Sequence, residues 1–228
     1  WLVGKVLGIK TIFIESTARV NLPSTFGNFV GRRSSTVLVQ WENVKRFYPN
    51  SIYAGLIFNI NNKPKLKKEK ITNIFITAGT YKIPFDRIFK AIDEIPVEYN
   101  LNVKAQIGVS NYIPSNYSFY KYADQSTVHA DMEAADLIIC QAGAGSIFDS
   151  LMLGKKVIAV PRLVKYQEFF DDHQKELAGN LGKEGILIYL ENTDNLIEAI
   201  EDSEGFIPDF QKLLSDDFLF KRILNDII

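Results

Sequence analysis

The chain has 228 residues, of which 46% are hydrophobic and 23% are charged, and its formal net charge is -1. These values are typical of a folded protein with one large or two small domains, and the charge balance excludes a globally basic nucleic-acid-binding protein. The single cysteine, Cys140, excludes an internal disulfide, and no apolar run approaches the roughly 20 residues that cross a bilayer. We therefore expect a cytoplasmic protein without a nucleic-acid partner.

The first 60 residues carry strand-like runs separated by polar segments. The runs lie at 10–16, 35–41 and 51–58. A short helix is expected over 23–33, with Arg32 and Arg33 at its end. Residues 61–70 hold five lysines together with asparagine and proline, which is typical of a linker and would also favour an anionic membrane surface. The chain starts in the middle of a pattern and without methionine, so we expect a fragment whose upstream part is missing.

Residues 71–228 alternate between strand-like and helix-like stretches. Strands are expected at 72–78, 102–108, 135–141, 155–161 and 185–190, and helices at 84–95, 126–135, 145–154, 166–182 and 193–202. This alternation predicts an α/β domain with a Rossmann-like parallel sheet that is covered on both faces. Ligands of such sheets bind at the carboxyl ends of the strands.

Two glycine-bearing turns follow strands of this second part. Gly79 and Thr80 come after the first strand, and Gly143, Ala144, Gly145 and Ser146 separate an apolar strand from a helix. Small residues allow a phosphate to approach the backbone, and the free N–H groups and dipole of the first helical turn favour negative charge. The alternative is a tight turn that needs glycine for packing alone. The residues that follow favour the anion site.

A third polar segment follows the strand that ends at Pro161. Asp172, His173 and Gln174 are expected near the start of a helix, close to the two glycine turns. Together the three segments offer the donors and acceptors that a nucleotide-sugar needs for its ribose, diphosphate and sugar hydroxyls. The two histidines lack partners at metal-ligand spacing, so the sequence predicts no metal site and does not require a divalent ion.

Three quoted stretches carry a family resemblance: ITNIFITAGTYKIPFDRIFKAIDE, DLIICQAGAGSIFDSLMLGKKVIAVPRL and DDHQKELA. They resemble the catalytic subunit of the eukaryotic transferase that adds the second sugar of the lipid-linked oligosaccharide from UDP-GlcNAc. They also resemble bacterial exopolysaccharide glycosyltransferases and the MurG-like C-terminal domain of glycosyltransferase family 28. The first block, with FIESTARVNLPSTFG, VLVQWENVKRFYP and SIYAGLIF, resembles the end of the membrane-anchoring partner subunit.

The resemblance implies a GT-B-type inverting glycosyltransferase in which two subunits are fused. Residues 1–60 would be the C-terminal part of the acceptor domain, and residues 71–228 would bind a UDP-sugar, which is the only cofactor-like molecule implied. Residues assigned by the match to the UDP diphosphate are Gly79, Thr80, Gly143, Ala144, Gly145 and Ser146. Asp149 would contact the ribose, and Asp172, His173 and Gln174 would face the sugar. The implied partners are a polyprenyl-diphosphate-linked acceptor, an upstream segment or partner subunit, and the inner membrane surface.

The general base of such a transfer is not evident in the sequence. Glu15 and His173 are the local candidates, although Glu15 also fits a structural role at a strand end and His173 fits one in orienting the donor. Gln141 stands where the eukaryotic family usually has histidine. Two further functions stay open. One is a UDP-GlcNAc 2-epimerase-like isomerase, and the other is a sugar-nucleotide-binding subunit that is inactive without another chain.

Overall fold

The computed structural model describes residues 1–56, 68–213, 223 and 225–226, and the chain divides into two compact units. One unit contains Trp1–Asn59 and Gln211–Ile228, and the other contains Ile60–Phe210. The sequence assigned the C-terminal end to the second domain, whereas Ile223 packs with Leu38 and Ala54 of the first unit. Most of the expected linker at 61–70 lies outside the described residues.

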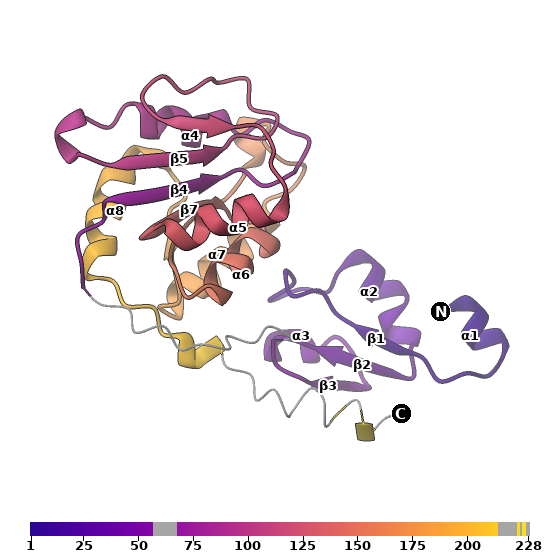
Figure 1. Cartoon of the computed structure of the whole chain (residues 1–228). Coiled ribbons are helices and arrows are strands. Elements are labelled where there is room, and N and C mark those ends of the chain that lie inside the picture. The colour runs from indigo at the N-terminus through magenta and orange to yellow at the C-terminus, as the bar shows by residue number, and fades with distance from the viewer. Residues whose placement is uncertain (57–67, 214–222, 224, 227–228) are drawn as a thin grey trace. The chain divides into compact units, whose positions relative to one another are not determined.

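The first unit is built on three parallel strands (Figure 1). Its elements are α1 (Leu2–Val6), β1 (Ile12–Ile14), α2 (Thr25–Phe29), β2 (Thr36–Val39), α3 (Glu42–Lys45) and β3 (Ser51–Tyr53). β2 is the central strand, and its residues Val37 and Val39 pack with Val44 and Tyr48 in the core. All three expected strands form. The helix expected over 23–33 is shorter and is followed by a 3-10 turn at Gly31–Arg33.

The second unit is built on a sheet of parallel strands in the order β6-β5-β4-β7-β8-β9. The strands are β4 (Asn73–Thr77), β5 (Asn102–Gln106), β6 (Ser118–Tyr120), β7 (Leu137–Gln141), β8 (Lys156–Val160) and β9 (Ile188–Tyr189). β4, β7 and β8 are almost wholly buried, because their apolar side chains face helices on both sides. The Rossmann-like α/β fold expected from the sequence is therefore confirmed.

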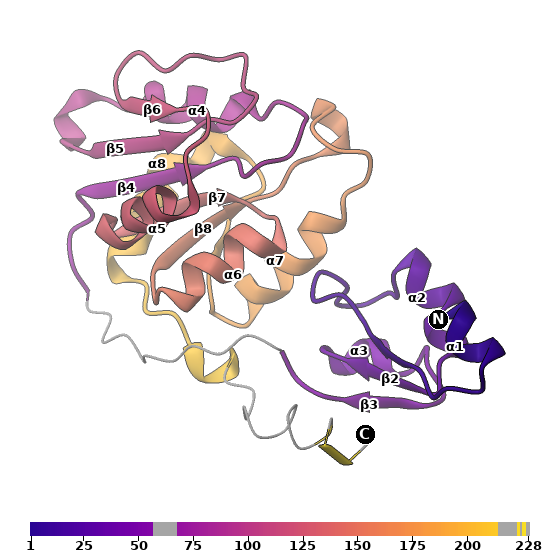
Figure 2. The ribbon, with the colours of Figure 1, turned by 45° about the vertical axis from the view of Figure 1, so that its right-hand side comes forward.

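Helices cover both faces of this sheet, as Figure 2 shows. They are α4 (Asp86–Asp93), α5 (Gln125–Ala134), α6 (Ala144–Met152), α7 (His173–Lys183) and α8 (Leu196–Gly205). α4 and α8 pack on one face through Phe89 and Ile200, and α5, α6 and α7 lie over the other. Alternate strand residues serve the two faces, so that Ile139 belongs to the core below α4 while Cys140 points the opposite way.

The structure differs from the sequence expectation at β6 and at the start of α7. β6 was not expected, and α7 begins at His173 rather than at 166. The residues before α7 form a 3-10 turn, Val164–Tyr166, and Gln167 then takes a left-handed conformation with φ of 59°. A left-handed residue interrupts a helix, so the apolar spacing over 166–172 belongs to a loop.

The strand order creates a topological switch point between β4 and β7. The chain leaves β4 toward β5 and β6, and then crosses back to add β7 on the other side of β4. Thr77, the last residue of β4, pairs with Cys140 of β7. The segments that follow β4 and β7 therefore leave the same edge of the sheet in opposite directions, which is where open α/β sheets bind ligands.

Candidate functional site

The two glycine turns meet at this switch point. Gly79 has φ of +67°, a conformation that side chains disfavour, and a Cβ atom there would collide with Nε2 of Gln141. The same Cβ position lies 3.5 Å from Oγ of Ser146, which is the third residue of α6. The turn after β4 and the start of α6 are thus in direct contact. Thr80, next to Gly79, is exposed at this edge.

The first turn of α6 presents unused backbone donors. Gly143 precedes the helix in an extended conformation, and no side chain caps the helix. The N–H groups of Ala144, Gly145 and Ser146 have no acceptor within the described part of the chain. A Cβ atom on Gly145 would meet no atom within 4 Å, so the space in front of this turn is open. The helix dipole adds partial positive charge here, and the arrangement suits an anionic group.

The third predicted segment joins the same edge of the sheet. α7 begins at His173, and Asp172 directly precedes it. The sequence likewise predicts Asp172, His173 and Gln174 near the start of a helix. Oε1 of Gln174 accepts a hydrogen bond from the backbone N–H of Arg162 at 3.0 Å. Oδ1 of Asp172 accepts one from the backbone N–H of Val164 at 2.9 Å, which ties the β8–α7 loop to the helix start. Gln174 is buried, whereas Asp172 is exposed.

His173 is held by a carboxylate and by aromatic rings. Its Nδ1 contacts Oδ1 of Asp171, and its ring packs edge-on against Phe169 with centroids 5.1 Å apart. Phe169 in turn packs against Tyr81 from the segment after β4, with centroids 4.6 Å apart. The carboxylate at Nδ1 orients the ring and leaves Nε2 as the ring nitrogen without a hydrogen-bond partner among the described residues.

Two further predicted residues are described by their own surroundings. Asp149 is farther along α6, where partial desolvation raises the pKa of its carboxyl and the nearby His129 opposes the rise. Glu15 belongs to the first unit and is 2% exposed. Its carboxylate accepts hydrogen bonds from the backbone N–H groups of Ser16 at 2.7 Å and Ser24 at 3.1 Å, and from the Tyr48 hydroxyl. These bonds give Glu15 a structural role in closing the loop after β1.

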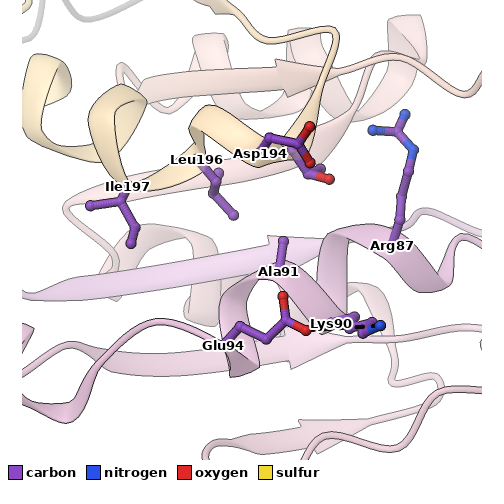
Figure 3. Close-up of a pocket in the computed structure, with 8 residues that line it drawn as sticks. Arg87, Lys90, Ala91, Glu94, Asp194, Leu196 and Ile197 are labelled. Carbon is purple, nitrogen blue, oxygen red and sulfur yellow. Dashed lines mark ion pairs between the residues drawn. The ribbon is translucent and has the colours of Figure 1, made fainter.

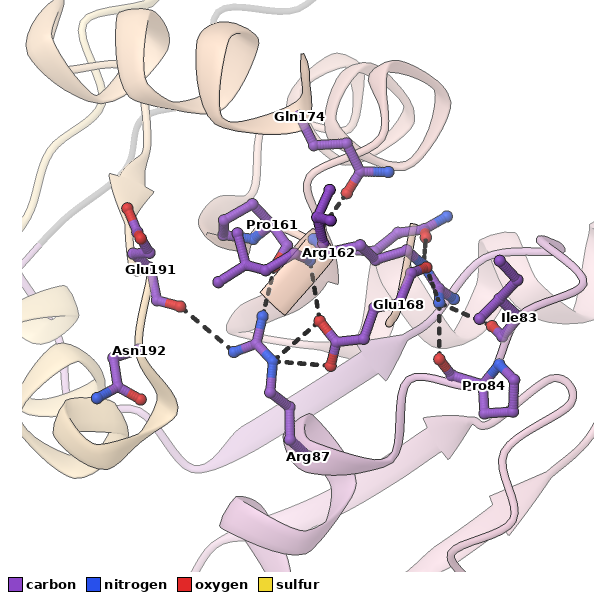
Figure 4. Close-up of polar contacts among 12 residues, drawn as sticks. Ile83, Pro84, Arg87, Pro161, Arg162, Glu168, Gln174, Glu191 and Asn192 are labelled. Atoms are coloured by element: carbon purple, nitrogen blue, oxygen red, sulfur yellow. Dashed lines mark hydrogen bonds and ion pairs between the residues drawn. The ribbon is translucent and has the colours of Figure 1, made fainter. Parts of the chain in front are cut away.

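The sequence reasoning missed a polar network beneath the turns, shown in Figure 4. Arg162 is 1% exposed and donates from Nε to Oε1 of Gln141 at 2.6 Å. Its remaining donors reach backbone carbonyls of the segment after β4. Burial lowers the pKa of Arg162 to about 10, so the guanidinium stays charged at neutral pH. The only sequence signal was an arginine placed directly after a strand and a proline.

A second arginine completes this network. Nε of Arg87 donates to both carboxylate oxygens of Glu168, at 2.9 and 3.1 Å, and the two side chains are 16% and 7% exposed. Oε2 of Glu168 also accepts a hydrogen bond from the backbone N–H of Leu163 at 3.1 Å. The pair therefore fixes the loop that carries Arg162 against α4.

Hollows also occur on other parts of the second unit. One of about 300 Å³ lies between α4 and the start of α8, lined by Ala91, Leu196 and the exposed Lys90–Glu94 pair (Figure 3). Within the described residues no group of three or more His, Cys, Asp or Glu side chains could hold a metal ion. No helix in that part of the chain is long and apolar enough to cross a membrane. Burial raises the pKa of the Cys140 thiol to about 12, which does not suit a nucleophile.

Comparisons with known proteins identify a family for the second unit. The model of the glycosyltransferase family 28 C-terminal domain matches residues 73–213. The human UDP-N-acetylglucosamine transferase subunit ALG13 is 32% identical over 129 residues, which are 51% of this chain and 11% of that protein. The UDP-N-acetylglucosamine--N-acetylmuramyl-(pentapeptide) pyrophosphoryl-undecaprenol N-acetylglucosamine transferase of Shewanella loihica is 25% identical over 230 residues, covering 94% of this chain and 60% of that enzyme.

Solved structures show the same fold. MurG of Acinetobacter baumannii matches 99% of this chain and 68% of its own with a TM-score of 0.61 and 18% identity. A putative UDP-N-acetylglucosamine 2-epimerase of Listeria monocytogenes matches 99% of this chain and 69% of its own, with a TM-score of 0.64 and 14% identity. The chain spans only about a tenth of the human relative and three fifths of the Shewanella enzyme.

Proposed function

This chain belongs to glycosyltransferase family 28, and on that basis we propose that it transfers a sugar, with inversion, from a UDP-sugar to a polyprenyl-diphosphate-linked acceptor. UDP-GlcNAc is the proposed donor, because the names of both curated relatives describe transfer of N-acetylglucosamine. The observation that carries the proposal is the uncapped start of α6, which faces Gly79 across the switch point with open space before Gly145. A diphosphate has the charge and size for that position.

The remaining parts of the donor have proposed partners around this point. The amide of Gln174 and the carboxylate of Asp172 would bind sugar hydroxyls, Asp149 would bind the ribose, and Thr80 would close over the phosphates. Of the two candidate bases, His173 is the better supported. Its Nδ1 contacts Asp171, so that Nε2 is the ring nitrogen that would face the acceptor, whereas the Glu15 carboxylate accepts hydrogen bonds from the backbone of its own unit.

The first unit is proposed to be part of an acceptor domain that works at the inner membrane surface. Exposed apolar side chains occur on its two N-terminal helices, at Leu2, Val3 and Val6 of α1 and at Phe26 and Phe29 of α2. Arg32 and Arg33 follow α2 directly. Apolar side chains next to basic ones suit an anionic bilayer surface. An upstream segment or a partner subunit would complete the domain, since the chain matches three fifths of the Shewanella enzyme.

Replacing Gln174 with alanine is expected to weaken binding of UDP-GlcNAc by about 1 to 3 kcal/mol and to leave UDP affinity nearly unchanged. The amide nitrogen of Gln174 has no partner among the described residues and is available to a sugar hydroxyl, whereas its Oε1 already accepts the backbone N–H of Arg162. Titration calorimetry with both ligands measures the difference. Equal losses for UDP and UDP-GlcNAc would contradict a role in reading the sugar.

The epimerase-like structure supports an isomerase as the second candidate function. Incubation of the chain with UDP-GlcNAc alone separates the two, because an isomerase forms the manno sugar nucleotide and a transferase gives at most slow hydrolysis. Transfer to a polyprenyl-diphosphate-linked acceptor, and no manno product, is the expected result. Binding of UDP-GlcNAc without either product, until a partner chain is added, would identify a sugar-nucleotide-binding subunit.

A further inference from the structure

Arg162 joins all three segments of the candidate site. It follows Pro161 at the end of β8, and its guanidinium reaches the carbonyl oxygens of Ala78 at 3.2 Å and Ile83 at 2.7 Å in the segment after β4. Its Nε reaches the Gln141 side chain at the end of β7, and its backbone N–H reaches the Gln174 side chain in α7. One buried residue therefore connects the chain ends of β4, β7 and β8 with the start of α7.

These bonds determine how two glutamine amides are turned. An arginine Nε–H and a backbone N–H can only donate, so the atom that each one meets must be an amide oxygen. Gln141 and Gln174 both offer Oε1 to Arg162, at 2.6 and 3.0 Å. Their amide nitrogens consequently occupy the other end of each group, as Figure 4 shows for Gln174.

The nitrogen of Gln141 lies between the two glycine turns. A Cβ atom on Gly79 would collide with it, and a Cβ atom on Gly143 would lie 3.4 Å from it. Gln141 is 8% exposed, and its Nε2 has no acceptor within the described residues. An –NH2 group without a partner, on a residue that is 8% exposed, thus points into the space beside the first turn of α6.

The charge around this amide is also unbalanced. Arg87 is neutralised by its ion pair with Glu168, whereas Arg162 makes no ion pair with any described carboxylate and is surrounded by carbonyl oxygens. Arg87, Glu168 and Arg162 together therefore carry one net positive charge, and the carboxylate of Asp86 also acts electrostatically on Arg162. A buried cation and an oriented donor at one place both favour a bound anion.

We propose that Arg162 is a positioning residue that holds the Gln141 carbonyl oxygen and so turns the Gln141 –NH2 group toward the diphosphate of the bound nucleotide. This inference rests on the proposed function, because it takes the nucleotide site to lie at the start of α6. Gln141 is the residue that touches the ligand, and Arg162 acts through it. The backbone N–H of Arg162 orients Gln174 in the same way toward the donor sugar.

The matched variant is Gln141→Glu in the full chain. A glutamate keeps the size and the oxygen that Arg162 requires, but it replaces the –NH2 donor with a second oxygen. The variant is expected to fold and to weaken UDP binding by about tenfold to a hundredfold in titration calorimetry. Gln106→Glu is the control, because Gln106 is similarly buried at the end of β5 and a glutamate keeps the oxygen that accepts the Thr77 hydroxyl. It should bind UDP as the unmodified chain does.

Arg162→Lys tests the positioning step. Lysine keeps the charge but lacks the Nε–H that holds Gln141, so UDP affinity should fall in Arg162→Lys. The double variant Arg162→Lys with Gln141→Glu should bind UDP no more weakly than Gln141→Glu alone. The side-chain amide resonance of Gln141, identified by its loss in Gln141→Glu, should shift as UDP saturates the unmodified chain. That resonance is informative even if Arg162→Lys does not fold.

The outcomes separate this inference from the proposed function. If the unmodified chain binds UDP with an affinity that Gln141→Glu leaves unchanged, the role of Arg162 and Gln141 is overturned but the proposed function is not. The same conclusion follows if UDP leaves the Gln141 amide resonance unmoved. Additive losses in the double variant would overturn the positioning step. An unmodified chain that does not bind UDP would overturn the proposed function, and this assignment with it.

Discussion

Replacing Gly145 with valine is expected to abolish UDP binding while the protein stays folded. Gly145 is the second residue of α6, and the space that its side chain would enter contains no protein atom within 4 Å. The Cβ atom of a valine therefore meets no atom outside its own helix and chain neighbours, and valine is a better helix residue than glycine by a few tenths of a kcal/mol. The same side chain would occupy the position where the diphosphate approaches the helix N–H groups.

Calorimetry with UDP and denaturant unfolding together measure this prediction. The affinity of Gly145→Val should fall by more than about a hundredfold, and its free energy of unfolding should stay within about 0.5 kcal/mol of the unmodified value. Gly145→Ala provides a graded control, because its single methyl group fills less of the space and should cost less affinity. Undiminished UDP binding by the valine variant would remove α6 from the site.

Replacing Glu168 with alanine is expected to destabilise the second unit by about 3 to 5 kcal/mol. The change leaves the Arg87 guanidinium, which is 16% exposed, without its carboxylate, and it leaves the backbone N–H of Leu163 without an acceptor. An uncompensated buried charge is among the more costly single changes in a folded protein. The midpoint of denaturant unfolding should therefore move clearly downward.

Glu94→Ala is the matched control for this experiment. Glu94 pairs with Lys90 at 3.8 Å on the same side of the sheet, but both side chains are more than half exposed, at 66% and 63%. An exposed ion pair of this kind contributes about 0 to 1 kcal/mol. Similar losses for Glu94→Ala and Glu168→Ala would show that burial of the Arg87–Glu168 pair does not matter for stability.

The sheet and its turns could be predicted because each depends on local patterns. Apolar runs such as 137–140, ended by glycine, identify buried parallel strands and the turns after them. β6 was missed because it is a short edge strand in which Ser118 and Phe119 are exposed, so it has no apolar run. The start of α7 was placed too early because the left-handed Gln167 carries no sequence signal comparable to a glycine.

The polar network was beyond sequence reasoning for a different reason. Arg162 is followed in the chain by ordinary loop residues, and its partners Gln141 and Ala78 are 21 and 84 residues away. Only the strand order brings these groups together, and nothing in the sequence marks an arginine that will be 1% exposed. Glu15 illustrates the converse case. Its position at a strand end led to the prediction of a base, and the structure shows that its carboxylate accepts hydrogen bonds from two backbone N–H groups and a tyrosine hydroxyl.

The family resemblance is confirmed by the match over residues 73–213 and by the relatives' identities, and the expected Rossmann-like fold is confirmed by the sheet. The roles of individual residues remain predictions. Among them, the turn at Gly143–Ser146 rests on the largest number of independent observations, since strand order, an uncapped helix and an open approach all coincide there.

The most direct measurement is a map of backbone amide resonances in the 228-residue chain during titration with UDP. The account predicts that the amides of Ala144, Gly145 and Ser146 shift most strongly, because the ligand's oxygens become their hydrogen-bond acceptors. The amide of Gly79, which donates to Oγ1 of Thr77 at 3.0 Å, should shift with them because it lies beside the ligand. Residues at the opposite edge of the sheet, such as Ile71 and Leu101, should stay unchanged. Large shifts around Ile71 and Leu101, with the amides of 144–146 unmoved, would contradict a diphosphate site at the start of α6.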